Sequence, residues 1–286
     1  MNNSGRIIEI YGITKDYKTN DFIMVMQYAE NGSLRQKLNK EFSLLSWSNK
    51  LDILKDIALG LNDIHKKGLT HQDFHSGNIL NKSDATYIAD LGLCKPADEE
   101  TEKHNKNVYG VLPYVAPEVL RGKTYTQASD VYGFGIIIYE VFNGLPPYHD
   151  MAHEGLLALK ICQGFRPKFN IKVPQLIEDI AKKCVDADPL KRPTAEYLQE
   201  TFEQWYIDVY LNVNENSEIY KQINEADEFN EKQPSFTKSP INTEFTYTTH
   251  PQAIYTSRLL NFNNLPEPKN ADNTHDGYSE EEYSGN

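Results

Sequence analysis

Three side chains with oxygen ligands lie within a short stretch of the sequence: Asp73, Asn78 and Asp90, in H-Q-D-F-H-S-G-N-I-L and T-Y-I-A-D-L-G. Short apolar runs at residues 78–80 and 87–89 predict two small strands. A hairpin of these strands would bring Asn78 and Asp90 to one end, facing Asp73. Amide and carboxylate oxygens placed in this way suit Mg²⁺, which takes one or two protein oxygens together with phosphate oxygens. The remaining carboxylate can accept a hydroxyl proton, so these residues predict phosphoryl transfer.

With these residues the chain resembles the catalytic domain of eukaryotic protein kinases. H-Q-D-F-H-S-G-N is similar to the catalytic loop H-R-D-L-x-x-x-N, and D-L-G is similar to the metal motif D-F-G. Three further matches follow in family order: Ala116-Pro117-Glu118 for A-P-E, Asp130 at the opening of the next helix, and Arg192 for the arginine that pairs with the A-P-E glutamate. Five matches in order, over residues 6–206, argue against a chance resemblance.

The resemblance implies a role for each matching residue. Asp73 would be the general base, with His75 and Asn78 beside it in the catalytic loop. Asn78 and Asp90 would hold Mg²⁺ against the phosphates of ATP. The adenine would meet Met26 as gatekeeper, the Gln27 carbonyl and the Ala29 N–H. Structural roles are implied for His71, Glu118, Asp130 and Arg192.

Apolar spacing predicts the elements that would position these residues. Residues 7–11 and 22–28 predict two strands, and helices are expected at about 34–39, 47–67, 126–143, 153–163, 174–185 and 194–206. The helix at 126–143 is apolar nearly all round and should be buried. The expected fold class is α+β, a kinase-like fold with a mostly helical large lobe and a remnant of the small-lobe sheet. The expected division is 1–33 for that remnant and the hinge, 34–210 for the large lobe, and 211–286 for an acidic, disordered tail.

Charge and composition argue against some classes of binding partner. The formal net charge is −12, and residues 207–286 hold 14 acidic and 5 basic residues, so most of the charge belongs to the tail. No basic patch indicates nucleic acid or anionic membrane, and no apolar run is long enough for a signal peptide core or a membrane span. Three distant cysteines predict a reducing compartment, the cytoplasm or the nucleus. One apolar island, Ala253–Leu265, is as consistent with a docking motif for a partner as with a leftover hydrophobic stretch.

The sequence departs from the family pattern ahead of Arg6, where nothing matches the glycine-rich loop, the strand lysine of V-A-I-K or its glutamate partner. We therefore expect most of the small lobe to be absent from these residues, because the protein is truncated or because the chain is a fragment of a longer one. ATP would then lack its upper wall and a cation on its α- and β-phosphates, which argues against activity of residues 1–286 alone. Gln72 replaces the loop arginine, so a phosphate at Thr101 or Tyr109 would lack its usual partner.

Markers of substrate class are also replaced. His75 stands where serine/threonine-specific members carry lysine, Gly77 where tyrosine-specific members carry arginine, and Val111 where the former carry threonine. The pattern is most similar to the tyrosine-kinase-like branch. The implied function is transfer of phosphate from ATP to serine, threonine or tyrosine hydroxyls of a protein substrate in signal transduction. The alternative is an inactive, truncated pseudokinase that serves as a protein-interaction module. A small-molecule phosphotransferase is disfavoured by the A-P-E segment and Arg192.

Overall fold

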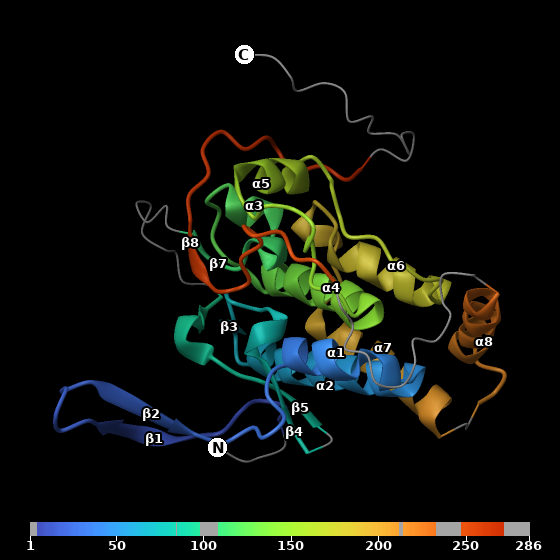
Figure 1. The fold of residues 1–286 in the computed structure, drawn as a ribbon, viewed down its shortest axis with the longest axis horizontal. Helices are drawn as coiled ribbons and strands as arrows, with labels where there is room; N and C mark the ends of the chain where they lie inside the picture. The colour runs from blue at the N-terminus through green and yellow to red at the C-terminus, as the bar shows by residue number, and fades with distance from the viewer. Residues whose placement is uncertain (1–4, 84, 98–107, 212–213, 233–246, 272–286) are drawn as a thin grey trace.

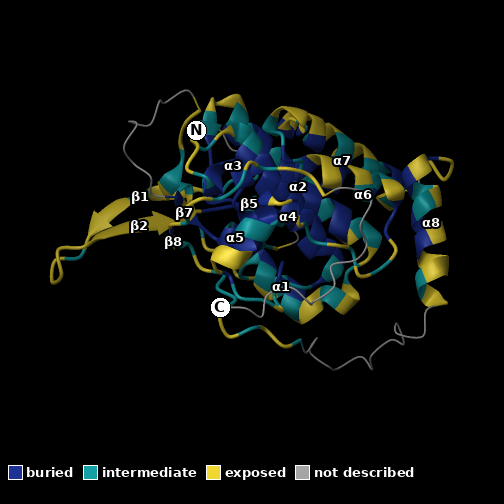
Figure 2. Cartoon of the chain, turned by 90° about the horizontal axis from the view of Figure 1, so that it is seen from above, coloured by how far each residue is buried: buried dark blue, intermediate teal, exposed yellow. Residues whose placement is uncertain are grey.

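The computed structural model describes residues 5–83, 85–97, 108–211, 214–232 and 247–271. A β-hairpin near the N-terminus projects from a body made mainly of helices (Figure 1). The hairpin consists of β1 (Ile10–Lys15) and β2 (Phe22–Met26), which pair antiparallel. Its turn is closed by the Asp16 carboxylate, whose Oδ1 accepts the Lys18 N–H at 2.7 Å. The two strands form a sheet of their own, and nearly all of their residues are exposed (Figure 2).

Several helices of the body begin at a residue whose side chain accepts a backbone N–H of the first turn. Ser46 accepts the Asn49 N–H at 3.2 Å, and Asn49 Oδ1 accepts the Ser46 N–H at 3.0 Å, so α2 begins with a capping box. Ser33, Thr126 and Thr194 cap three other helices. The helices are α1 (Leu34–Glu41), α2 (Trp47–Lys66), α3 (Pro117–Leu120), α4 (Gln127–Asn143), α5 (Gly155–Cys162), α6 (Gln175–Cys184), α7 (Ala195–Tyr210) and α8 (Glu218–Glu231).

Helix α4 forms the centre of the body, as its sequence predicts. From Ser129 to Phe142 all of its residues are buried, because α2 lies on one side of it and α6 on another. Gly133 and Gly135 allow close approach, since a Cβ at either position would come within 2.7 Å of Phe74 O or 2.6 Å of Cys184 Cβ. Gly133 therefore lets the centre of the core pack directly under the catalytic loop.

Short strand pairs attach the site to this body. Strands β4 (Ile79–Lys82) and β5 (Ala85–Ile88) form the predicted hairpin, with Ile79 opposite Ile88. Strand β3 (Leu69–Thr70) pairs with β6 (Lys95–Pro96). Strand β7 (Val108–Gly110) pairs antiparallel with β8 (Arg258–Leu260), which comes from the far end of the sequence.

The prediction that residues 211–286 lack order is wrong for two stretches. Helix α8 begins at Ser217 and buries Ile219, Ile223 and Ala226, which recur at helical spacing within a polar segment. The average polarity of the tail conceals this single apolar stripe. Residues 247–271 are extended and packed on the body, while residues 233–246 and 272–286 lie outside the described part of the chain.

Candidate active site

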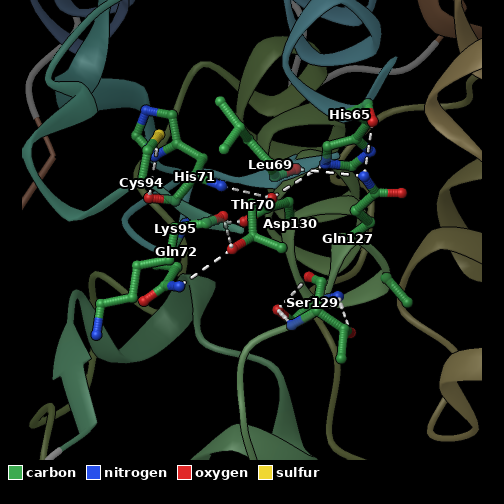
Figure 3. A network of polar contacts seen from close by, with 12 residues as sticks. His65, Leu69, Thr70, His71, Gln72, Cys94, Lys95, Gln127, Ser129 and Asp130 are labelled. Atoms are coloured by element: carbon green, nitrogen blue, oxygen red, sulfur yellow. Dashed lines mark hydrogen bonds and ion pairs between the residues drawn. The ribbon is translucent and has the colours of Figure 1, made fainter. Parts of the chain in front are cut away.

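The backbone of the catalytic loop is held by the buried carboxylate of Asp130, at the start of α4 (Figure 3). Its Oδ2 accepts the His71 N–H at 2.8 Å, and its Oδ1 accepts the Gln72 N–H at 3.0 Å. His65 Nε2 lies 3.0 Å from the same Oδ2. Three partners and a helix N-terminus compensate the desolvation of this charge. The two residues before Asp73 are therefore fixed in place, and His65 is a contributor that the sequence did not identify.

His71 joins the catalytic loop to the strand that leads into Asp90. Its Nε2 lies 3.0 Å from the Ala89 carbonyl oxygen, and its Nδ1 accepts the Asp73 N–H at 3.3 Å. Since a carbonyl can only accept, Nε2 must carry the hydrogen. Burial lowers the pKa of His71, against the opposing influence of the Asp130 charge, and so favours the neutral ring that this arrangement needs.

Asn78 and Asp90 come together through the β4–β5 hairpin, as their positions in the sequence predict. The Ala89 N–H donates to the Asn78 carbonyl at 2.8 Å, directly before Asp90. Asn78 Nδ2 donates to the Asp73 backbone carbonyl at 3.0 Å and to its Oδ2 at 3.2 Å. Asp90 has a φ of 58°, a left-handed conformation that aspartate tolerates, and its side chain is exposed.

The oxygens left over in this cluster fit a hard divalent cation. The Asn78 amide nitrogen donates to Asp73, so its amide oxygen is available to a ligand. Asp90 Oδ1 accepts only a long contact of 3.4 Å from the Gly92 N–H. Asp73 Oδ1 is buried and has no hydrogen-bond partner among the described residues. Carboxylate and amide oxygens are the donors that Mg²⁺ prefers, and it commonly takes one or two of them beside phosphate oxygens.

His75 lies directly against the carboxylate of Asp73. Its Nδ1 accepts the Gly77 N–H at 3.1 Å, so the neutral ring carries its hydrogen on Nε2, which lies 3.6 Å from Asp73 Oδ2. Burial by itself would raise the pKa of Asp73, but the His75 Nε2–H and the Ser257 hydroxyl, which both lie beside the carboxylate, outweigh burial and lower the pKa. Asp73 is therefore an ionised carboxylate with oriented hydrogen-bond donors, which is the state a proton acceptor requires.

The predicted pair between Glu118 and Arg192 is present. Nη1 and Nη2 of Arg192 donate to the two carboxylate oxygens at 2.7 and 2.8 Å, and both side chains are buried. Arg192 also donates to the backbone carbonyls of Ala128 and Asp186. The segment after the A-P-E triplet is thereby fastened to the start of α4 and to the loop before α7.

The residues expected to meet adenine lie at the end of the exposed hairpin. Met26 ends β2 with 41% of its side chain exposed. The Gln27 N–H donates to the Glu9 carbonyl at 2.8 Å, while the Gln27 carbonyl and the Ala29 N–H make no hydrogen bond to another described residue. The hairpin also presents exposed apolar side chains, since Ile10, Ile23 and Val25 are each 44–46% exposed.

The segment between Asp90 and Glu118, which corresponds to the activation segment of protein kinases, is only partly described by the structure. Thr101 lies outside the described residues, whereas Tyr109 lies in β7. The Gln72 side chain turns back to Thr70, with Nε2 3.0 Å from Oγ1. Burial raises the pKa of the Cys94 thiol to about 12, which agrees with an inert rather than a reactive cysteine.

Comparison with known proteins identifies the family. The model of the protein tyrosine and serine/threonine kinase family matches residues 2–202. The chain belongs to this family and is a protein kinase domain, and the predicted α+β kinase fold is confirmed. No helix within the described residues combines the length and apolarity needed to cross a membrane.

Individual relatives carry kinase names of several specificities. A probable serine/threonine-protein kinase of Dictyostelium discoideum is 28% identical over 76% of this chain and 13% of its own length. A tyrosine-protein kinase of Girardia tigrina is 28% identical over 72% of this chain and 44% of its own length. A dual specificity protein kinase of Dictyostelium discoideum is 30% identical over 61% of this chain and 8% of its own length. The chain thus spans less than half of each of these relatives.

Proposed function

We propose that this domain transfers the γ-phosphate of ATP to a hydroxyl group of a protein substrate. The observation that carries the proposal is the environment of Asp73. Its ionised carboxylate is buried, accepts hydrogen bonds from Asn78 Nδ2 and, at 2.5 Å, from the Ser257 hydroxyl, and lies 3.6 Å from His75 Nε2. A general base must lie within hydrogen-bond reach of the proton it removes, and Asp73 meets this requirement.

The transfer is an in-line displacement at phosphorus. The acceptor hydroxyl oxygen forms a bond to the γ-phosphorus while the bond from that phosphorus to the β,γ-bridging oxygen breaks. ADP leaves with the electron pair of the broken bond, and the hydroxyl proton passes to Asp73 Oδ2. Mg²⁺, held by Asn78 and Asp90, would neutralise charge on the phosphates when bound. His75 and Asn78 act as positioning residues, since both contact the carboxylate of Asp73.

The nucleotide side of the proposal rests on family resemblance. Met26, Gln27 and Ala29 would take the adenine, and a glycine-rich loop and a lysine would be needed on the α- and β-phosphates. We place the domain in the tyrosine-kinase-like branch because His75, Gly77 and Val111 replace the markers of both substrate classes. The kinase is favoured over the pseudokinase alternative because Asp73, Asn78 and Asp90 are all retained and brought to one end of the β4–β5 hairpin.

The test is transfer of phosphate to an added general protein substrate. It uses residues 1–286, and in parallel the same chain with the small lobe of a related kinase fused ahead of Arg6. Asp73→Asn should lower the rate by a factor of about 10²–10⁴, the usual contribution of a general base. The exposed Asp179→Asn, on α6, is the matched control and should have no effect. Equal rates for the fused chain and its Asp73→Asn variant would contradict the proposal.

A further inference from the structure

The segment of residues 247–271 returns to the kinase domain and lies along it in an extended conformation. It begins where the Tyr247 hydroxyl contacts Asn39 Oδ1 at 3.2 Å and ends where Asn270 Oδ1 accepts the Ala187 N–H at 2.9 Å. In Figure 1 it is the orange-red segment that carries β8 past β7 and continues beside α5. The apolar island Ala253–Leu265, for which a docking motif was one of two interpretations, lies within this segment, and the surface it covers belongs to its own chain.

Ser257 brings its hydroxyl to the catalytic base. Its Oγ donates to Asp73 Oδ2 at 2.5 Å and lies 3.2 Å from His75 Nε2. Because Nε2 carries the hydrogen of the neutral His75 ring, it donates to Ser257 Oγ. The hydrogen of the serine must therefore point to Asp73, whose carboxylate can only accept. An acceptor hydroxyl awaiting transfer requires the same arrangement.

The neighbouring hydroxyl groups are placed elsewhere. The Tyr255 hydroxyl donates to the Pro147 carbonyl at 2.9 Å, and the Arg35 guanidinium lies 4.1 Å from the centre of the Tyr255 ring. Arg35 is itself fixed by Ser76 and Tyr114, at 2.8 and 2.6 Å. Thr256 is exposed. Of the three successive residues with hydroxyl groups, 255–257, Ser257 is therefore the one whose hydroxyl contacts Asp73.

Backbone pairing fixes this register on the other side of Ser257. Strand β8 adds to β7, with Arg258 opposite Gly110 and Leu259 opposite Tyr109. The Leu260 side chain is buried, and the Arg258 guanidinium donates to the His153 carbonyl. Addition of a strand combined with side-chain pockets is a common way for a domain to hold an extended peptide. Ser257 is therefore held in place by contacts of Tyr255 on one side and of Arg258–Leu260 on the other.

We propose that Ser257 is an intramolecular phosphoacceptor, and that its segment occupies the place of other protein substrates until it is phosphorylated. This inference rests on the proposed function and deepens it, because it names serine, in an extended segment with tyrosine two residues before it and arginine directly after it, as the acceptor class. Ser257 Oγ bonds to the γ-phosphorus of ATP, the bond to the β,γ-bridging oxygen breaks, ADP leaves, and the Ser257 proton passes to Asp73. The phosphate then repels the Asp73 carboxylate and releases the segment.

Phosphate mapping by mass spectrometry tests the transfer. Mg-ATP and a general protein substrate are added to residues 1–286 and, in parallel, to the chain fused to a related small lobe. We expect phosphate on Ser257, at a fractional rate that tenfold dilution of the protein leaves unchanged, because an intramolecular acceptor has a fixed effective concentration. Asp73→Asn and Ser257→Ala should each abolish the signal at this position. The matched control Thr256→Ala should retain it.

Failure of this inference and failure of the proposed function would give different results. Phosphate on the added substrate but none on Ser257, in the same protein, would overturn this inference and leave the proposed function standing. Phosphate on neither acceptor, in either protein, would overturn both. A rate at Ser257 that falls tenfold with tenfold dilution would assign the transfer to a second molecule and overturn the intramolecular assignment.

A second measurement tests the contact between Ser257 and Asp73 in the absence of ATP. Ser257→Glu places a carboxylate against Asp73 and should speed hydrogen exchange of the Arg258–Leu260 amides at least tenfold. Thr256→Glu, which adds the same charge at an exposed position one residue away, should change exchange less than twofold. Adding Asp73→Asn to Ser257→Glu should restore slow exchange. Equal exchange in the two glutamate variants would show that residue 257 does not face Asp73 and would overturn the inference.

Discussion

The two ends of the active site are built in different ways. At the acceptor end, the positions of Asp73 and His71 are set by hydrogen bonds among buried groups, and the exposed fractions of these residues are 6% and 0%. At the end proposed to take the nucleotide, here called the nucleotide end, Met26 and Val25 lie on a two-stranded hairpin and remain 41% and 44% exposed (Figure 2). The geometry around Asp73 is therefore a property of the buried helical core, whereas the geometry around Met26 depends on a surface that the described residues leave open.

The physical reason lies in what each end buries. Buried polar groups must be paired, so the partners of Asp130 specify one arrangement of the catalytic loop. A lone two-stranded hairpin buries little apolar surface and is marginally stable. The acceptor end should consequently resist perturbation until the core is damaged, and the nucleotide end should respond to whatever covers the hairpin.

The largest expected effect is a loss of stability when a buried ion pair beneath the acceptor end is broken. Glu118→Ala leaves the Arg192 guanidinium buried without its carboxylate, which should cost about 3–5 kcal/mol of unfolding free energy. Chemical denaturation measures this loss. Glu196→Ala removes the exposed partner of Lys66, a surface pair, and should cost at most about 1 kcal/mol. An unchanged midpoint for Glu118→Ala would remove this pair from the account.

The next effect concerns the nucleotide end. A related small lobe fused ahead of Arg6 should cover the hairpin and supply the phosphate-binding loop and lysine. Since one preorganised donor is commonly worth a factor of about 10²–10³ in rate, phosphate transfer should rise by at least that factor. Asp73→Asn in the fusion should abolish the gain. Robust transfer by residues 1–286 alone, lost in Asp73→Asn, would show that the acceptor end needs less from the nucleotide end than this comparison implies.

A subtler change tests the anchor of the catalytic loop. Asp130→Asn keeps the shape of the side chain but replaces one acceptor oxygen by a donor, which then faces a backbone N–H. Leaving a buried group unsatisfied should cost about 1–3 kcal/mol. Thermal unfolding of the variant beside the Asp179→Asn control measures the difference. Equal stability of the two variants would mean that the Asp130 contacts do not fix the loop.

The smallest expected effect is a dependence of stability on pH. Burial lowers the pKa of His71, so the folded state binds its proton less readily than the unfolded state, in which the pKa is about 6.5. The stabilisation is present above that pH and is lost as the pH falls toward the folded-state pKa. His71→Gln, which cannot titrate but can still donate to Ala89, should lose less stability between pH 7.5 and 5.5. Identical losses in parent and variant would contradict a neutral, buried His71.

Local features of the sequence predicted much of this arrangement. Apolar spacing located the helices α1, α2 and α4 to α7 close to their observed bounds, and the burial of α4 follows from its residues alone. Motif order placed the catalytic loop, and the structure shows the contact of Asp73 with Asn78 that this placement implies. These features depend on spacing over a few residues, or on residue types that a particular chemistry requires.

The features that sequence reasoning missed are long-range. His65 contributes through a contact 65 residues away, and nothing in its own helix marks it. The stripe of α8 is hidden in a polar segment, where only packing against the body shows its use. The contact of Ser257 with Asp73 spans 184 residues, so the sequence could identify an apolar island but neither its receptor nor its register.

Hydrogen exchange on residues 1–286 reports on both ends of the active site in a single experiment. We expect slow exchange of the His71 and Gln72 amides, which donate to buried Asp130, and exchange at least a hundredfold faster for the Ile13 and Met24 amides of the exposed hairpin. Comparable rates at the two ends, or a catalytic loop that exchanges as fast as the hairpin, would contradict an acceptor end assembled independently of the nucleotide end.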